Sequence, residues 1–154
     1  MVYIKDEGSE FDAPIDHVWK YLDDGDAHDA AHKTSRNPNF EKVSDITFIY
    51  SSERYLRGKW APDKMRMSMF PPVSVVIEWL DGVLTGSKLV YLYTPKGEKT
   101  GIDVYGEFVS KTLPPTEVEA TAREFLESEF RDDAPAVRAR YLKAKEIGKA
   151  AGRS

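Results

Sequence analysis

The fold of this chain is indicated most clearly by residues 11–23, which read FDAPIDHVWKYLD. The residues before this segment, Val2–Phe11, have the pattern of a β-strand. Pro14 suits the first turn of a helix, where the missing N–H of proline would be unpaired in any case. Val18 and Leu22 then lie at helical spacing. The segment therefore predicts a strand that turns directly into a short amphipathic helix. A second short helix is predicted at residues 27–33, after Gly25 ends the first and with Asp26 as its cap.

Downstream, apolar and polar residues alternate with a period of two, which is typical of β-strands. Strands are predicted around residues 46–51, 55–60, 65–69, 73–79, 88–94 and 100–109. Turn-forming residues separate several of them, at positions 61–64, 71–72, 81–82 and 95–98. Because these connections are too short for crossover helices, the six strands are predicted to form an antiparallel meander, and the first strand makes seven.

Residues 117–148 are predicted to be helical, with Val118, Ala122, Phe125 and Leu126 as their apolar stripe. One straight helix of this length would span about 48 Å, whereas a ten-residue strand spans only about 33 Å. Pro135 also follows an acidic cap signal. A kink or two helices is therefore predicted, followed by a frayed tail at residues 149–154.

Composition restricts the class of protein. The 154 residues suit one domain over residues 1–154, and 41% hydrophobic residues can form a substantial core. The absence of cysteine excludes disulfides and thiolate chemistry. A net charge of −4 argues against nonspecific binding to nucleic acid or to anionic lipid surfaces. The N-terminus does not resemble a signal peptide, and the apolar runs are too short to span a membrane. We expect a soluble, cytoplasmic protein that binds no nucleic acid and has no stable membrane insertion.

The order of predicted elements resembles the SRPBCC superfamily, which includes START lipid-transfer domains, the birch-pollen allergen family and polyketide cyclase-like proteins. The resemblance covers nearly the whole chain. Its best local matches are residues 11–23 and the hairpin at residues 93–102, which reads YTPKGEKTGI. It implies an α+β helix-grip fold: a seven-stranded curved antiparallel sheet around a long C-terminal helix, with two short helices after the first strand. Both motifs indicate the fold, but neither indicates which ligand is bound.

The resemblance also implies a cavity between the sheet and the last helix. If Arg66 and Glu78 face water, the alternating residues of their strands face inward. Large aromatic side chains and flexible methionines suit an adaptable apolar pocket, although alternation alone also fits a filled core. The predicted ligand-binding residues are Phe48, Tyr50, Met65, Met67, Trp79, Tyr91, Phe125 and His32.

His28 and His32 would share one face of the second short helix. Together with a nearby aspartate they offer ligands for zinc, but the pair lacks a His-Glu-x-x-His motif and an assigned third ligand. The prediction is therefore no metal and no cofactor. Near a cavity entrance, either histidine would instead contact a ligand or transfer protons.

The expected function is binding of a small hydrophobic ligand, such as a lipid or a polyketide, in this cavity. One alternative is an enzyme of the cyclase or dehydratase type that uses Tyr or His groups there. Another is a module that binds a protein partner through a sheet edge or helix. The residues leave open whether the protein is an enzyme.

Overall fold

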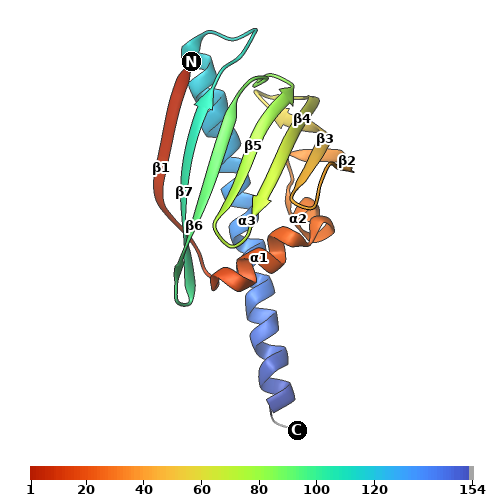
Figure 1. Cartoon of the computed structure of the whole chain (residues 1–154), viewed down its shortest axis with the longest axis vertical. Coiled ribbons are helices and arrows are strands. Elements are labelled where there is room, and N and C mark those ends of the chain that lie inside the picture. The colour runs from red at the N-terminus through yellow and green to blue at the C-terminus, as the bar shows by residue number, and fades with distance from the viewer. Residues whose placement is uncertain (153–154) are drawn as a thin grey trace.

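The computed structural model describes residues 1–152 as a curved antiparallel sheet packed around one long helix (Figure 1). The elements in chain order are β1 (Val2–Phe11), α1 (Ile15–Asp23), α2 (Gly25–Ala31), β2 (Ser35–Lys42), β3 (Thr47–Leu56), β4 (Lys59–Phe70), β5 (Ser74–Asp81), β6 (Lys88–Lys96), β7 (Lys99–Phe108) and α3 (Pro115–Gly152). The short helix α1 lies across α3 at one end of the sheet, and α2 lies to one side of α3, near β2 and β3 (Figure 1). This is the α+β helix-grip arrangement that the sequence predicts.

The sheet has the strand order β1-β7-β6-β5-β4-β3-β2, so β1 and β2 are its edges. All neighbouring strands are antiparallel, as the short connections require. The predicted number of seven strands is confirmed, but one strand is missing from the prediction and one predicted strand is not a separate strand. The strand at Ser35–Lys42 was not predicted, because Asn37 has a φ of 54° beside a register shift and the alternation is lost there.

The second error concerns residues 55–64. Sequence predicts a strand at 55–60 and a turn at 61–64, whereas the chain turns at Arg57 and Gly58 and residues 61–64 lie within β4. Both turn residues have positive φ, 57° and 77°, as a tight two-residue hairpin requires. The correction matters for the site, because Asp63 becomes a buried residue of the sheet rather than an exposed turn residue.

The two sequence motifs of the fold contact each other. The Thr100 hydroxyl, at the start of β7, donates a 2.8 Å hydrogen bond to the carbonyl of Ala13 between β1 and α1. Trp19 of α1 donates to the carbonyl of Pro72, in the turn between β4 and β5, at 2.9 Å. These two bonds fix where α1 crosses the end of the sheet.

Helix α2 begins earlier than the sequence predicts. It starts at Gly25 rather than Ala27, and its cap is Asp24 rather than Asp26. The Asp24 carboxylate accepts a 3.2 Å hydrogen bond from the backbone N–H of Ala27, which satisfies one of the free donors of the first turn. His32 is the C-terminal cap of this helix, so it still lies one turn beyond His28.

Helix α3 is continuous from Pro115 to Gly152, with Pro135 inside it. Of the two predicted alternatives, a division into two helices is therefore wrong, whereas one long C-terminal helix is confirmed and a kink in it stays a prediction. Proline removes one helical hydrogen bond, but buried residues hold the helix in place on both sides: Asp132 and Asp133 before it, and Val137 and Tyr141 after it. The C-terminal part of α3 extends past α1, beyond the sheet (Figure 1). The helix includes residues 149–152 of the predicted frayed tail; residues 153–154 lie outside the described residues.

The inward face of the sheet is the one that the alternation predicts. In β3, β4 and β5, cross-strand partners form two rows, Phe48–Met67–Ile77 and Tyr50–Met65–Trp79. On the opposite face, Arg66 and Glu78 are exposed and lie 3.6 Å apart. The stripe on α3 formed by Val118, Ala122, Phe125 and Leu126 is buried, as predicted.

Candidate functional site

A cavity lies between the concave face of the sheet, α2 and α3. Its main lobe has a volume of about 370 Å³, and a smaller lobe of about 80 Å³ extends towards β1 and β7. The two lobes share wall residues, including His28, Phe48, Met67 and Glu129. The main lobe lies near the lower end of the usual range for small-molecule pockets, about 300–1,000 Å³.

One wall of the main lobe is apolar and comes from the sheet and α3. It consists of Phe48, Met65, Met67, Met69, Ile77 and Phe125. The polar residues that line the same lobe come from α2 and its C-terminal cap, from β2 and β3 and from α3, and together they are called the polar wall here. It consists of His28, Asp29, His32, Ser35, Tyr50, Arg54 and Glu129. Phe40 of β2, which is 47% exposed, lies at the rim. The cavity therefore suits a molecule that combines apolar surface with hydrogen-bonding groups.

The cavity borders all but one of the residues predicted to bind a ligand. Those on its walls are Phe48, Tyr50, Met65, Met67, Tyr91, Phe125 and His32. Trp79 lines neither lobe. Its side chain is buried between Phe108 and Phe125, with ring centroids 5.9 and 5.0 Å away. Strand alternation places Trp79 on the correct face, but it cannot show that another aromatic ring covers it.

A separate depression of about 560 Å³ lies beyond Arg54, between the β3–β4 hairpin and the segment before α3. Arg57, Lys59 and Asp81 line it together with smaller residues. Because exposed charged side chains form much of its wall, it is less suited to an apolar ligand than the cavity. Arg54 borders both spaces.

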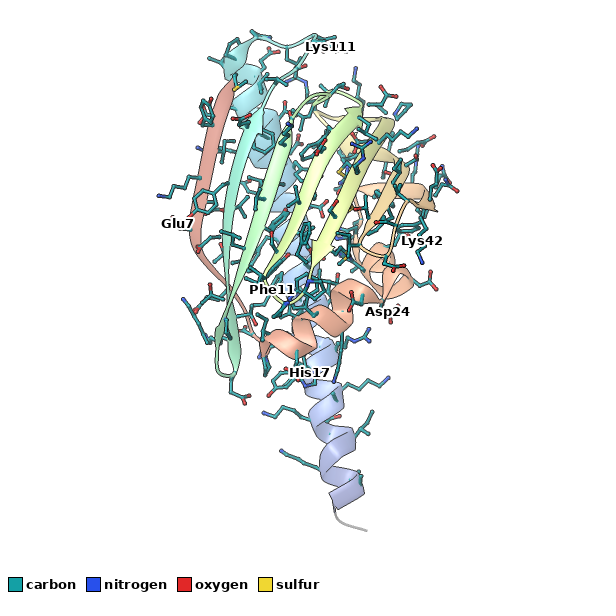
Figure 2. All side chains as sticks on the ribbon, viewed as in Figure 1. Glu7, Phe11, His17, Asp24, Lys42 and Lys111 are labelled. Atoms are coloured by element: carbon teal, nitrogen blue, oxygen red, sulfur yellow. The ribbon has the colours of Figure 1, made fainter. Side chains whose placement is uncertain are left out.

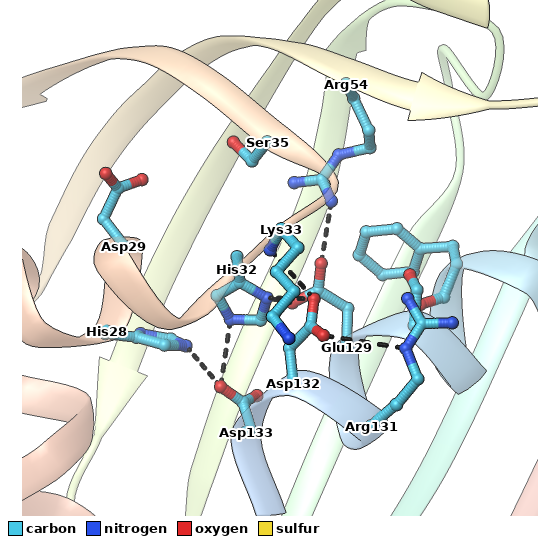
Figure 3. Close-up of polar contacts among 12 residues, drawn as sticks. His28, Asp29, His32, Lys33, Ser35, Arg54, Glu129, Arg131, Asp132 and Asp133 are labelled. Carbon is cyan, nitrogen blue, oxygen red and sulfur yellow. Dashed lines mark hydrogen bonds and ion pairs between the residues drawn. The ribbon is translucent and has the colours of Figure 1, made fainter. Parts of the chain in front are cut away.

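The polar wall is organised around Asp133 of α3 (Figure 3). Its Oδ1 atom accepts a 2.7 Å hydrogen bond from the hydroxyl of Tyr21. The same oxygen lies 3.2 Å from Nε2 of His28 and 2.9 Å from Nε2 of His32. Nδ1 of His32 lies 3.3 Å from a carboxylate oxygen of Glu129. Helices α1, α2 and α3 thus all contribute to one buried polar cluster.

Arg54 extends this cluster into the sheet. Its guanidinium lies 2.7 Å from Glu129 and 3.1 Å from Asp63, and its side chain is only 4% exposed. It also lies over the ring of Phe125, 4.9 Å from the centroid. Because a buried charge needs a partner, Arg54 compensates the two carboxylates, and they compensate it.

A third polar group lies where α2 approaches β2 and β3. The hydroxyl of Tyr50 donates a 2.9 Å hydrogen bond to Asp29, and it also contacts the hydroxyl of Ser35. Burial raises the pKa of Tyr50, so the hydroxyl remains protonated at neutral pH. Because this proton is donated to Asp29, the Tyr50 oxygen can accept a hydrogen bond inside the cavity, and it can donate one only if the contact with Asp29 opens.

The protonation of the cluster follows from its contacts. Burial alone would lower the pKa of His32, but Glu129 and Asp133 outweigh it and raise the pKa to about 9. Burial alone would raise the pKa of Asp133, but contacts with His28 and His32 hold it well below its usual range. At neutral pH the wall thus presents an imidazolium between carboxylates.

Sequence reasoning did not find Arg54, Glu129 and Asp133. In the sequence, Glu129 looks like part of the charged face of a solvated helix, Asp133 looks like part of an acidic cap before Pro135, and Arg54 lies between two predicted strands. One available signal of a polar site on α3 is the adjacent pair Asp132 and Asp133, although before Pro135 the same pair also predicts a helix break. Asp132 instead accepts a 3.1 Å hydrogen bond from the backbone N–H of Lys33, just after α2.

No protein-family model and no curated protein matches this sequence. Solved structures, in contrast, match it over nearly its full length. A START superfamily protein from Mycobacterium smegmatis is 14% identical, with a TM-score of 0.69 over 92% of this chain and 98% of the other. The Zhui aromatase/cyclase from a Streptomyces species is 15% identical, with a TM-score of 0.64 over 94% and 93%.

A protein from Thermus thermophilus is 12% identical, with a TM-score of 0.71 over 93% of this chain and 99% of the other. These likenesses establish that the chain has the same helix-grip fold as the START superfamily protein and the aromatase/cyclase. At such low identity they concern the fold alone. Within residues 1–152, no helix combines the length and the apolar character needed to cross a membrane.

Proposed function

We propose that this protein binds a small, largely hydrophobic molecule with at least one hydrogen-bonding group in the cavity between the sheet and α3. The observation that carries the proposal is that the main lobe is lined both by apolar residues such as Met67 and by polar residues such as His32. Burial of the ligand's apolar part would supply most of the affinity. The polar wall would orient the molecule.

Methionine supports an adaptable site. Met65, Met67 and Met69 follow one another along the cavity side of β4. Unbranched thioether side chains can adjust to ligands of different shape. We therefore expect selectivity to come more from the polar wall than from the shape of the apolar one.

A homologous series of linear alkanols tests the proposal, with displacement of the dye anilinonaphthalene sulfonate as the readout. Each methylene contributes about 0.8 kcal/mol when buried, which corresponds to roughly fourfold tighter binding per carbon until the cavity is full. Met67→Trp should fill the junction of the two lobes and abolish this dependence. Val73→Trp is the matched control, because Val73 is 56% exposed and lies outside the cavity.

Affinity that does not change with chain length would contradict the proposal. So would equal loss of binding in the two tryptophan variants, because the dye would then be bound at a surface site. Native mass spectrometry of the protein purified from its own cells would identify a retained ligand directly.

A second candidate function is cyclisation of a polyketone-like substrate. It is favoured by the placement of His32 and Tyr50 on the cavity wall, where an imidazolium and a hydroxyl could transfer protons to a bound carbonyl compound. Incubation with a linear triketone, followed by mass spectrometry for the dehydrated ring, tests it. His32→Gln should abolish turnover but retain triketone binding; turnover that survives in this variant would rule out the role of His32.

A further inference from the structure

Three potential metal ligands converge on the polar wall of the cavity: Nε2 of His28, Nε2 of His32 and a carboxylate oxygen of Asp133 (Figure 3). All three atoms lie within 4.8 Å of one another. We propose that they form a binding site for a divalent first-row transition ion such as Zn²⁺. The sequence alone does not reveal this site, because the third ligand, Asp133 on α3, lies far from the two histidines along the chain.

The distances fit a metal ion with little movement. Zinc binds imidazole nitrogen at about 2.0–2.1 Å and carboxylate oxygen at about 2.0–2.2 Å, so ligands of a tetrahedral ion are about 3.3–3.5 Å apart. Oδ1 of Asp133 lies 3.2 Å from Nε2 of His28 and 2.9 Å from Nε2 of His32. Small side-chain rotations would open these contacts to the required separation.

The hydrogen bonding of His32 points independently to a missing ligand. Its side chain is only 8% exposed, yet neither ring nitrogen has a hydrogen bond of good geometry among the described residues. The contact between Nε2 and Asp133 is short but poorly directed. Buried polar atoms are normally paired, and a metal ion would satisfy this nitrogen.

The surroundings of the three ligands are those that metal sites commonly have. Glu129 lies 3.3 Å from Nδ1 of His32, on the side of the ring away from the proposed ion. The hydroxyl of Tyr21 donates to Asp133. Carboxylates behind histidine ligands, and donors to ligating carboxylates, fix the ligand orientation.

Charge balance also favours a cation. Glu129, Asp132 and Asp133 bring three carboxylates to one buried region, and Asp63 lies beyond them. Arg54 is the buried arginine that faces this group, and it is already shared between Glu129 and Asp63. Protonated His32 and Arg131, which lies 3.6 Å from Asp132, balance part of this negative charge, and a bound dication that replaces the His32 proton would add further positive charge.

The ligand types select the class of ion. Two imidazoles and one carboxylate suit Zn²⁺, Fe²⁺, Co²⁺ or Ni²⁺, whereas Mg²⁺ and Ca²⁺ prefer oxygen ligands alone. His28 borders both lobes of the cavity, His32 borders the main lobe and Asp133 the smaller one. With three protein ligands, the remaining coordination position would face the cavity, as in sites that bind a substrate atom.

Isothermal titration of EDTA-treated protein with ZnCl₂, in the absence of any hydrophobic ligand, tests the site independently of the proposed function. We expect saturable one-to-one binding and no comparable binding of Mg²⁺. His28→Gln and His32→Gln should each weaken Zn²⁺ binding by about 100-fold or more, since loss of even an outer partner costs about 10–100-fold. Replacement of Zn²⁺ by Co²⁺ should give visible absorption bands far more intense than those of aqueous Co²⁺, because coordination by the protein with tetrahedral geometry strengthens them.

The matched control is His17→Gln. His17 is the remaining histidine; it lies on α1 against Tyr141, with ring centroids 4.7 Å apart, and is not part of the cluster (Figure 2). Its replacement should leave Zn²⁺ affinity unchanged. His28, with a side chain 23% exposed, can be replaced at less risk to folding than His32, and circular dichroism would confirm that the variant is folded.

Absence of one-to-one Zn²⁺ binding by the wild-type protein would overturn the proposal. Equal loss of affinity in His17→Gln and in a folded His28→Gln would do the same, because the ion would then be bound at the surface.

Discussion

Nε2 of His32 lies 2.9 Å from Oδ1 of Asp133, so the end of α2 is joined to the middle of α3 inside the cavity wall. Asp133 lies two residues before Pro135, at the point where the sequence predicts that the helix breaks. Because α3 continues, its carboxylates face the histidines instead of capping a new helix. The fold and the candidate site therefore depend on the same turn of helix.

The stability of the metal-free protein should fall as pH rises from about 6.5 to about 9. His32 has a pKa of about 9 in the folded protein, above the ordinary value of 6.5. Folding therefore favours its protonated form; this stabilisation is complete below pH 6.5 and is lost as pH rises through the folded pKa. At about 1.36 kcal/mol per pKa unit, the loss is on the order of 3 kcal/mol. Urea unfolding in EDTA at several pH values measures this loss of stability.

His32→Gln should lack this part of the pH dependence. An identical dependence of stability on pH in both proteins would contradict the assignment to His32.

Arg54→Met should lower the free energy of unfolding by about 3–5 kcal/mol, because it leaves the carboxylates of Asp63 and Glu129 without their buried partner. Arg36→Met is the control. Arg36 lies 2.6 Å from Glu53, but both side chains are exposed, and such pairs contribute about 0–1 kcal/mol. Urea unfolding of the two variants at neutral pH makes the comparison. A similar loss of unfolding free energy in both variants would show that the buried ion pairs of Arg54 stabilise the protein no more than the exposed pair of Arg36.

Trp79→Ala should destabilise the protein by about 3–5 kcal/mol without a specific effect on ligand binding, because Trp79 packs behind the cavity wall. Met67→Ala should cost less, below about 2 kcal/mol, because its side chain already borders open space. It should nevertheless weaken binding of the alkanols more than Trp79→Ala does. Thermal unfolding and dye displacement on both variants distinguish the two roles, and the opposite order of effects would place Trp79 in the site.

Pro135→Ala should stabilise the protein by about 1–3 kcal/mol. In a continuous helix, proline lacks the N–H that would bond to the carbonyl of Arg131, and its exposed ring fills no core space. Pro115→Ala is the comparison, since proline in the first helical turn carries no such cost and its removal should be neutral or slightly destabilising. Guanidinium unfolding checks both. A loss of stability in Pro135→Ala would mean that the proline is required for the bend or position of α3.

Much of this protein could be predicted from short stretches of sequence. Alternation identified the inward faces of β4 and β5, and helical spacing identified the buried stripe around Phe125. These patterns are local, because a strand or helix repeats every two or 3.6 residues and one buried face selects apolar residues at that period. Seven of the eight predicted ligand-binding residues accordingly border the cavity.

Tertiary structure alone decided the rest. Strand β2 is defined by pairing with β3, since its own residues are mostly exposed and show no alternation. The continuity of α3 through Pro135 depends on buried contacts on both sides of the proline. The cluster of His32, Glu129 and Asp133 joins residues from opposite ends of the chain. Sequence periodicity cannot predict such a contact. It forms only when folding brings α2 and α3, which are separated by the six strands β2–β7, together and removes their charged groups from water.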